Sequence, residues 1–255
     1  MLTDNQLRRY ARNISLPGVG KEGQEKLLAA QVLVIGAGGL GAPVLAYLAS
    51  SGVGHIGIVE DDRVELSNLQ RQILFETGDI GRFKAEAARD RISELNPEIR
   101  ITLHRQRLDN ANAAALMREY DIVVDTSDNF ATRFAVNAAC LAEKKTLVSG
   151  AVRAFEGQLA VFKPYLGENQ PCYRCFVGGA PDDERGCRDL GVLGALTGIV
   201  GSMQALETLR ELLGIGESSA GKLLRFDALT MQWKSSILLQ DPDCECCGSR
   251  PLKGL

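Results

Sequence analysis

The sequence predicts an α/β fold built on a Rossmann-like, mainly parallel sheet, because the parts of a nucleotide-binding βαβ unit come in order near its start. Residues 31–35 (QVLVI) form a continuous apolar run, which is typical of a strand buried on both faces. The glycine-rich stretch GAGGLG follows at residues 36–41, and an apolar helical segment runs on to about Ser51. A second apolar run at residues 55–59 ends on Glu60, about 20 residues beyond the glycines, where Rossmann folds carry a carboxylate.

The remaining apolar segments extend this pattern along the chain. Helices are expected at residues 3–14, at 83–95, after residue 129, and at 192–209. Strands are expected at residues 100–104, 122–124, 146–149, 158–162, 223–227 and 235–239. Strands and helices alternate early and strands follow one another later. We therefore expect helices on both faces of a parallel sheet that continues into a mixed sheet, within a single domain of residues 1–255.

Composition limits the classes of function. The 255 residues are 45% hydrophobic and carry a net charge of −3 without a basic block, so we expect no nucleic-acid ligand. The N-terminus has no apolar signal core, and the apolar residues 192–209 include Gln204 and Glu207, so we expect a helix packed within the protein and no membrane partner. Seven cysteines without an export signal indicate a reducing compartment, and we expect a cytoplasmic protein.

The glycine-rich loop indicates a nucleotide, and the charges that follow it favour ATP. The glycines of the loop are Gly36, Gly38, Gly39 and Gly41. Such a loop fits a phosphate at a helix N-terminus, but it also fits NAD, or tight packing alone. Asn68 and Arg71 in the segment SNLQRQ (residues 67–72), and Lys84 after it, supply the extra positive charge and polar contacts that a triphosphate requires. Taken singly, each of these could be a solvated surface group.

Carboxylates at two predicted strand ends are candidates for the ribose and for Mg²⁺. Glu60 is placed to hold ribose hydroxyls, although a solvated acidic strand end would look the same, and Asp62 could instead stabilise the local loop. Asp128 follows the strand at residues 122–124, at the edge of the sheet where parallel α/β folds bind ligands, and a carboxylate there suits Mg²⁺ bridging phosphates. Asp128 could equally be the N-cap of the next helix, and the local sequence leaves both interpretations open.

Two C-x-x-C pairs are the strongest local signal. A short turn directs two thiolates at one ion, and Cys172/Cys175 together with Cys244/Cys247 would complete a closed, structural Cys₄ zinc site. About 70 residues separate the pairs, so the site would tie the C-terminal segment to the body of the fold. Cys246 lies inside the second pair and makes its register ambiguous. The alternative is unrelated buried or redox cysteines.

A third cysteine feature lies in the polar, glycine-rich stretch at residues 178–191, which is expected to be a long loop. Cys187 stands there between Arg185 and Arg188, and two cations favour the thiolate. Cys187 is therefore a candidate nucleophile, although an incidental loop cysteine is an equal alternative. Cys140 lies in an alanine-rich helical segment and is expected to be inert core.

In combination these segments resemble the MoeB/ThiF family, relatives of ubiquitin-activating enzymes, over nearly the whole chain. The resemblance rests on RYxR at residues 9–12, GAGGLG, SNLQRQ, Lys84, TSDN at 126–129, SGA and EGQ within 149–158, and CYRC at 172–175 with the second C-x-x-C pair. It implies a homodimer that uses Mg²⁺ and ATP and holds structural Zn²⁺. It also implies adenylation, with release of pyrophosphate, of the C-terminal carboxylate of a small ubiquitin-like sulfur-carrier protein ending in Gly-Gly.

The resemblance also implies a role for each matching position. Glu60 stands at the ribose, where the family usually has Asp, and Arg12 matches an arginine that reaches into the site of the partner subunit. The residues expected at the nucleotide and its metal are Gly36, Gly38, Gly39, Gly41, Glu60, Asp62, Asn68, Arg71, Gln72, Lys84, Asp128 and Asn129. The residues expected to carry catalysis are Arg12, Arg71, Lys84, Asp128 and Cys187. The domain would comprise a helical N-terminus (1–30), an ATP-binding part (31–160) and a carrier-binding and zinc part (161–255).

The substrate stays open between two carriers. The first expectation is the small subunit of molybdopterin synthase, in molybdenum cofactor biosynthesis. The alternative is the sulfur carrier of the thiamine pathway, because residues 129–133, 184–188 and 232–233 look ThiF-like. No rhodanese domain is recognised, so a separate sulfur-donor protein is expected.

Two alternative interpretations belong to other classes of function. An NAD-binding Rossmann oxidoreductase would leave Arg71, Lys84 and Asp128 unexplained, and His55 and His104 are the only histidines available as acid or base. A catalytically dead scaffold would not need the cationic and acidic positions that the chain retains.

Overall fold

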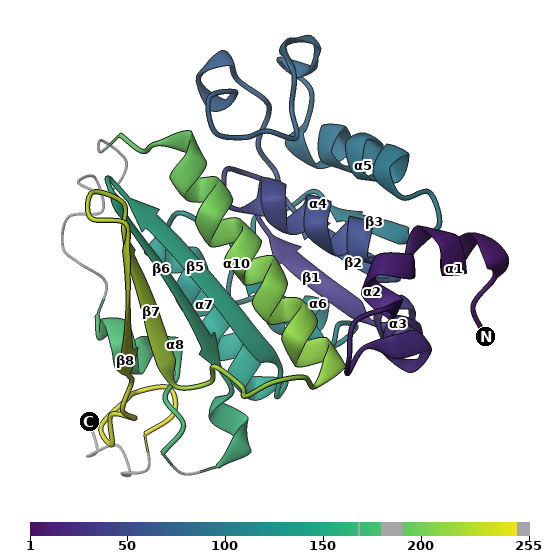
Figure 1. Ribbon diagram of the computed structural model, residues 1–255. Helices are drawn as coiled ribbons and strands as arrows, with labels where there is room; N and C mark the ends of the chain where they lie inside the picture. Colours follow the sequence, from purple (N-terminus) through teal and green to yellow (C-terminus); the bar gives the residue numbers. More distant parts are fainter. Residues whose placement is uncertain (168, 180–190, 249–255) are drawn as a thin grey trace.

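One eight-stranded sheet, with helices on both faces, organises the computed structural model of the protein, which describes residues 1–167, 169–179 and 191–248 (Figure 1). The strand order is β3-β2-β1-β4-β5-β6-β7-β8. The strands are β1 (Gln31–Ile35), β2 (His55–Val59), β3 (Arg100–His104), β4 (Ile122–Asp125), β5 (Thr146–Arg153), β6 (Glu156–Phe162), β7 (Lys222–Asp227) and β8 (Gln232–Ile237). The pairs among β3, β2, β1, β4 and β5 are parallel, and the pairs from β5 to β8 are antiparallel. This confirms the predicted mainly parallel sheet that continues into a mixed one.

The strand register brings the ends of three strands to one edge of the sheet. Ile35 at the end of β1 pairs with Val59 at the end of β2 and with Asp125 at the end of β4. The chain therefore leaves all three strands at the same level. Because parallel strands share one direction, the segments that follow them converge there, as parallel α/β folds require for a ligand site.

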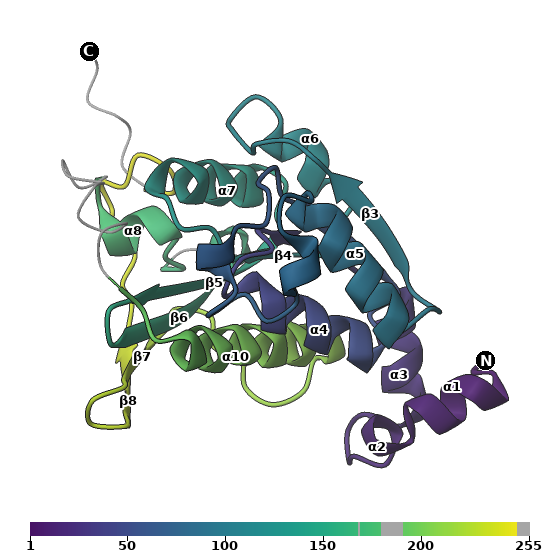
Figure 2. The same cartoon turned by 90° about the horizontal axis from the view of Figure 1, so that it is seen from above.

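Helices cover the two faces in separate groups (Figure 2). Their bounds are α1 (Asp4–Arg9), α2 (Ala11–Ile14), α3 (Gly20–Ala29), α4 (Gly41–Ser51), α5 (Lys84–Leu95), α6 (Ala113–Met117), α7 (Phe130–Ala142), α8 (Tyr173–Val177) and α10 (Gly194–Leu213). Apolar side chains of α4, α5 and α10 pack on one face of the sheet, against residues such as Val34 and Val124. Side chains of α6, α7 and α8 pack on the other face, against residues such as Leu33 and Val123. Successive strand residues thus enter different cores, as a strand buried on both faces requires.

The single helix predicted at residues 3–14 is wrong, because the chain breaks at Tyr10 into α1 and α2. Tyr10 is 1% exposed, and its hydroxyl accepts a hydrogen bond from Asn96 Nδ2 at 2.8 Å. Its ring lies so close to Gly52 that a Cβ added there would stand 2.6 Å from Tyr10 Cζ. Burying this large side chain against α4 and α5 turns the chain, which an amphipathic pattern alone does not reveal.

The apolar stretch at residues 192–209 forms the first part of α10, which packs against α4 and across β5 and β6 (Figure 1). Contact with α4 is close, since a Cβ on Gly201 would lie 2.4 Å from the carbonyl oxygen of Leu40. Gln204 is fully buried and donates from Nε2 to the carbonyl of Asp125 at 2.8 Å. The expected packed helix is confirmed, and no helix in the described ranges has the length and hydropathy to cross a bilayer.

Candidate active site and metal centre

The glycine-rich loop joins β1 to α4 and is shaped by two glycines that no other residue could replace without strain. Gly36 has φ +94°, in the left-handed region, and a Cβ on Gly41 would lie 2.2 Å from the carbonyl oxygen of Gly36. Thr126, directly after β4, donates from Oγ1 to the carbonyls of Ile35 and Gly36 at 2.7 and 3.0 Å. The end of β4 therefore buttresses the loop, a role that sequence reasoning did not assign to Thr126.

Glu60 supports the same loop from β2. Its Oε2 accepts from the backbone N–H of Ala37, and its Oε1 accepts from that of Asp62, both at 2.9 Å. Burial raises the pKa of the Glu60 carboxyl, and these two hydrogen bonds act in the opposite direction. Glu60 is thus built into the loop and is not a solvated strand end. Its predicted contact with a ribose remains a prediction.

Lys84 opens α5 and points its ammonium group at the acidic strand end. The residue is 6% exposed, and its Nζ lies 3.0 Å from Oδ2 of Asp62, whose side chain is 69% exposed. The backbone N–H of Lys84 also donates to the carbonyl of Asp62 at 2.9 Å. Asp62 therefore positions Lys84, which agrees with the interpretation that it stabilises the local loop.

The SNLQRQ segment folds over the glycine-rich loop through the short 3₁₀-helix η1 (Leu66–Asn68). Asn68 is 8% exposed and accepts at Oδ1 from the backbone N–H of Glu65 at 3.2 Å. Arg71 is half-buried, and its Nη1 donates to the carbonyl of Ser67 at 3.0 Å. Gln72 is 4% exposed and lies against Gly38, and its Oε1 has no hydrogen-bond partner among the described residues. A buried acceptor of this kind is open to a donor from a ligand or a water molecule.

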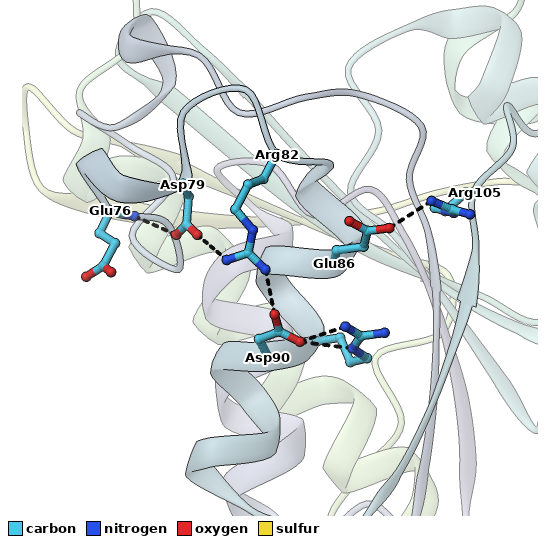
Figure 3. Close-up of polar contacts among 7 residues, drawn as sticks. Glu76, Asp79, Arg82, Glu86, Asp90 and Arg105 are labelled. Carbon is cyan, nitrogen blue, oxygen red and sulfur yellow. Dashed lines mark hydrogen bonds and ion pairs between the residues drawn. The ribbon is translucent and has the colours of Figure 1, made fainter.

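Ion pairs hold the loop between this segment and α5 in place (Figure 3). Arg82 pairs with Asp79 at 2.6 Å and with Asp90 on α5, while Asp79 also accepts from the backbone N–H of Glu76 at 3.1 Å. Asp79 is mostly buried, but Arg82 and Asp90 are exposed, so each pair contributes little to stability. Their effect is geometric, because they join the loop to the helix that begins with Lys84. Sequence reasoning missed this network.

Asp128 is exposed beyond the end of β4, and no hydrogen bond or ion pair engages its side chain within the described residues. The interpretation of Asp128 as the N-cap of α7 is wrong, because the cap is Asn129, whose Oδ1 accepts from the backbone N–H of Thr132 at 2.9 Å. The Asp128 carboxylate is therefore available to a ligand. Asn129, which we also expected at the nucleotide, is occupied by this capping bond.

Arg133 is a further charged residue at this edge to which we assigned no role. It is 7% exposed on α7 and donates from Nη2 to the carbonyls of Ser127 and Gly150. Burial acts to lower the pKa of Arg133, but Asp125, Tyr173 and Asp128 together outweigh it and the pKa is raised. Arg133 thus joins the loop after β4 to the middle of β5, beside Asp128. The signal that could have found it is a lone arginine among the apolar residues of α7.

Arg12 does not join these residues within one chain. It is exposed on α2, whose neighbouring Asn13 donates to the carbonyl of Ser51 at the C-terminal end of α4. The glycine-rich loop precedes the opposite end of α4 (Figure 1). An 11-residue helix is roughly 16 Å long, farther than an arginine side chain can extend. Cys187, the fifth expected catalytic residue, lies outside the described residues.

The four paired cysteines converge beside α8. The Sγ–Sγ distances are 3.9 Å between Cys172 and Cys175, 3.7 Å between Cys172 and Cys244, and 3.3 Å between Cys175 and Cys247. A tetrahedron with zinc–sulfur bonds of about 2.3 Å has edges of about 3.8 Å, whereas a disulfide bond is about 2.05 Å long. The cluster thus fits a tetrahedral metal centre. Cys246 is not among the four, which resolves the register of the second pair.

The two remaining predictions on cysteine concern burial. Cys140 is 1% exposed, and burial raises the pKa of its thiol, as expected for inert core. Burial also raises the pKa of Cys172 to about 12. A neutral thiol is a poor ligand, so a cation at the cluster would have to supply the electrostatic energy that ionises Cys172.

A model of the ThiF family matches residues 10–247 of this sequence. The chain belongs to the ThiF family. Sulfur carrier protein adenylyltransferase from Thermus thermophilus is 49% identical over 98% of this chain and 93% of the relative. Molybdopterin-synthase adenylyltransferase from Escherichia coli is 44% identical over 97% and 98% of the two chains. These names confirm the expected class of enzyme, an adenylyltransferase.

A longer ThiF family relative and two solved structures complete the comparison. Adenylyltransferase and sulfurtransferase MOCS3 from Culex quinquefasciatus is 46% identical over 98% of this chain, which spans 57% of that protein. The crystal structure of Escherichia coli MccB with ATP matches with a TM-score of 0.77 at 22% identity, over 94% of this chain and 73% of that one. PaaA matches with a TM-score of 0.79 at 19% identity, over 94% and 76%. The two structures support the fold alone.

Proposed function

We propose that this ThiF family member adenylates the C-terminal Gly-Gly carboxylate of a small ubiquitin-like sulfur-carrier protein and releases pyrophosphate from ATP. The observation that carries the proposal is the convergence of the glycine-rich loop, Lys84 and Asp128 at one edge of the sheet. The named relatives act on sulfur carriers or on molybdopterin synthase. The molybdopterin-synthase small subunit is the first candidate substrate. Residues 1–255 would form one catalytic domain.

ATP suits the residues at this edge. The glycine-rich loop lies at the N-terminus of α4, where phosphate binds well, and the close backbone approach of Gly36 and Gly41 shapes it. Gln72 Oε1 lacks a donor, and the Asp128 carboxylate is unengaged within the described part of the chain. Arg71 and Lys84 would hold the phosphates, and Asp128 would hold Mg²⁺, which supplies charge neutralisation when bound.

The chain's own groups would act through charge and position. The attacking carboxylate is already ionised near pH 7, so no side-chain base is required. Its approach to a phosphate is opposed by repulsion between negative charges. Lys84 is desolvated and held by Asp62, and Arg71 is held by the Ser67 carbonyl, so both cations are oriented before substrate arrives. Such preorganised charges stabilise the charge that develops in the transition state.

We further propose a homodimer in which Arg12 completes the site of the partner subunit. The position of α2, at the far end of α4 from the glycine-rich loop, argues against a role for Arg12 in its own subunit. A surface for the partner is available on the outer side of α4 and α10, where Tyr47, Ile199 and Leu206 are 54%, 37% and 50% exposed. These apolar side chains on adjacent helices would be covered by a partner subunit that docks there.

The carrier would dock at the antiparallel end of the sheet. All six residues of β8 are exposed, and β8 is the last strand of the sheet, with one edge unpaired among the described residues. The strand and the turn before it expose Leu229, Met231 and Ile237 by 72%, 70% and 79%. An apolar edge strand is a template for a partner protein. Trp233, 41% exposed on the same strand, belongs to the segment that favours the thiamine-pathway carrier, which is therefore the second candidate.

We propose zinc at the cysteine cluster, as a structural centre. Four thiolates leave no open coordination position for a substrate, and the sulfur spacing of 3.3–3.9 Å fits tetrahedral zinc. Zinc would join α8 to the segment that follows β8. Sequence-distant loops would thereby be held together without a large apolar core of their own.

The decisive experiment is ATP–pyrophosphate exchange against a panel of Gly-Gly-ending carriers. Exchange that depends on one carrier would identify the substrate, and a carrier lacking its last glycine is the matched control. Exchange with the molybdopterin-synthase small subunit alone supports the first candidate, and exchange with the thiamine-pathway carrier alone supports the second. Binding of NAD without exchange with any carrier would overturn the proposal.

A further inference from the structure

Asn137 is a polar residue in the core that the function proposed above does not use. It lies on α7 and is 1% exposed, between Val136 and Ala139, which belong to the apolar core. An asparagine is an unfavourable residue inside a helix, and a buried amide costs free energy unless its hydrogen bonds are made. Its presence in the core therefore calls for partners, and the structure supplies two.

The two partners of Asn137 fix the orientation of its amide. Oδ1 accepts from the backbone N–H of Tyr173 at 2.8 Å, and Nδ2 lies 3.5 Å from Sγ of Cys172. Turning the amide over would place two N–H groups against each other, so the oxygen must face Tyr173. The N–H group is left to donate to the sulfur of Cys172. Both contacts are buried.

From this geometry we infer that Asn137 is a positioning residue of the metal centre, which donates an N–H···S hydrogen bond to the thiolate of Cys172. The inference rests on the proposed metal at the cysteine cluster. Cys172 is buried, so the negative charge of its thiolate needs neutralisation beyond what the metal gives. A hydrogen-bond donor next to the sulfur supplies it. The same bond fixes the direction from which Cys172 approaches the metal.

Asn137 also links the metal centre to the edge of the sheet that carries Asp128. Arg133 lies four residues before it on α7, one helical turn away, and holds the carbonyls of Ser127 and Gly150. One buried face of α7 thus holds the loop after β4 through Arg133 and the first cysteine pair through Asn137. The helix fixes the distance between the two regions.

A purely structural role for Asn137 is the competing explanation. The first residue of α8 is Tyr173, and the N-cap residue Cys172 makes no side-chain capping bond, so Asn137 Oδ1 serves as the cap. Asn137→Asp separates the two roles. It keeps the oxygen that caps Tyr173, and a negative charge at a helix N-terminus is favourable, but it removes the N–H donor to the sulfur.

The test is the rate at which zinc passes from the full-length protein to a chromophoric chelator, for wild type, Asn137→Asp and the neutral Asn137→Ala. We expect both variants to release zinc about 10–100-fold faster, in line with the loss of metal affinity when such a supporting contact is removed. In cobalt-loaded Asn137→Ala, the sulfur-to-metal charge-transfer band should move to lower energy, because the thiolate has lost a hydrogen bond. The matched control is Asn96→Asp, an equally buried asparagine whose amide bonds Tyr10 and Ala49. It should transfer zinc at the wild-type rate even if its Tm falls.

Folded, zinc-loaded Asn137 variants that release zinc within twofold of the wild-type rate would overturn the inference. If the variants do not fold, cadmium-113-loaded wild-type protein decides the question. Scalar coupling between the cadmium and the side-chain amide protons of Asn137 supports the hydrogen bond, and its absence overturns it. A wild-type protein that holds no zinc would instead overturn the proposed metal centre, which separates that failure from failure of the inference.

Discussion

The parallel and antiparallel ends of the sheet assemble their sites by different means. At the parallel end, β1, β2 and β4 finish in register, and the backbone delivers the glycine-rich loop, Glu60 and Asp128 to one edge. At the antiparallel end, the cysteines lie outside the strands, on or beside α8 and in the segment after β8, and Cys172 and Cys244 are 72 residues apart in sequence. Hydrogen-bonded strands position the residues at the parallel end, whereas the cysteine side chains at the antiparallel end are positioned around the centre of their own cluster. Loss of one side chain should therefore impair chemistry at the first site and folding at the second.

The largest effect is expected at the cysteine centre. Cys172→Ala should abolish zinc binding and lower the Tm strongly, since structural zinc in small peptides contributes roughly 10–16 kcal/mol of apparent binding free energy. Metal analysis should find one zinc per chain in wild type and none in the variant. Cys246→Ser is the control and should keep its zinc, because Cys246 is outside the group of four. Freshly purified wild-type protein without zinc would contradict the prediction.

At the parallel end, Arg71→Ala, Lys84→Ala and Asp128→Ala should each reduce pyrophosphate exchange by roughly 10²–10³ with little change in Tm. Loss of Lys84 leaves behind an Asp62 carboxylate that is already 69% exposed, so the fold should tolerate it. Arg105→Ala removes a surface cation that pairs with Glu86 and serves as the matched control, with near wild-type exchange expected. Near-normal exchange in one of the three variants would remove that residue from the proposed site.

Subunit mixing tests whether the parallel end is complete within one chain. Arg12→Ala and Asp128→Ala chains, each inactive alone, should recover about a quarter of wild-type activity when mixed. Random exchange makes half of the dimers mixed, and each mixed dimer holds one intact site and one site with both substitutions. The figure of a quarter assumes that loss of either residue nearly abolishes activity at its site, as is typical for charge-stabilising groups. If Arg12 served its own subunit, every site would carry a lesion. No recovery, with subunit exchange shown independently, would exclude the trans role.

The smallest effect concerns acid. Both histidines belong to the parallel end, and burial lowers the pKa of His55 and of His104, with the charge of Arg100 lowering that of His55 further. Below about pH 6.5 the unfolded chain therefore binds more protons than the folded one, and the free energy of unfolding should fall as the pH falls through that range. An NMR titration should place both histidine pKa values below about 6.5. A value above it for either residue would contradict the burial of that ring.

The parts of the candidate site that depend on local pattern could be predicted from the sequence. Continuous apolar runs, the glycine spacing and the segment after residue 122 predicted β1, β2, β4 and the edge where they meet, because these features depend on the two periodicities of backbone structure. The break at Tyr10 could not be predicted, since it depends on a contact with Asn96, 86 residues away. The sequence also could not decide whether Asp128 or Asn129 caps α7. The two residues are neighbours, and the position of a helix end depends on which side chain reaches a free backbone N–H.

By itself, the sequence determined the class of fold, the presence of two C-x-x-C pairs and the set of charged residues expected at a nucleotide, because each depends on residue type and short spacing. Only the tertiary structure decided which of those residues meet. In the structure the cysteine cluster contains Cys247 and not Cys246, and Lys84 pairs with Asp62. Arg133 is buried next to Asp128, and Arg12 lies too far from the candidate site of its own chain to reach it. These outcomes depend on distances between segments far apart in the chain, and packing of the core sets such distances.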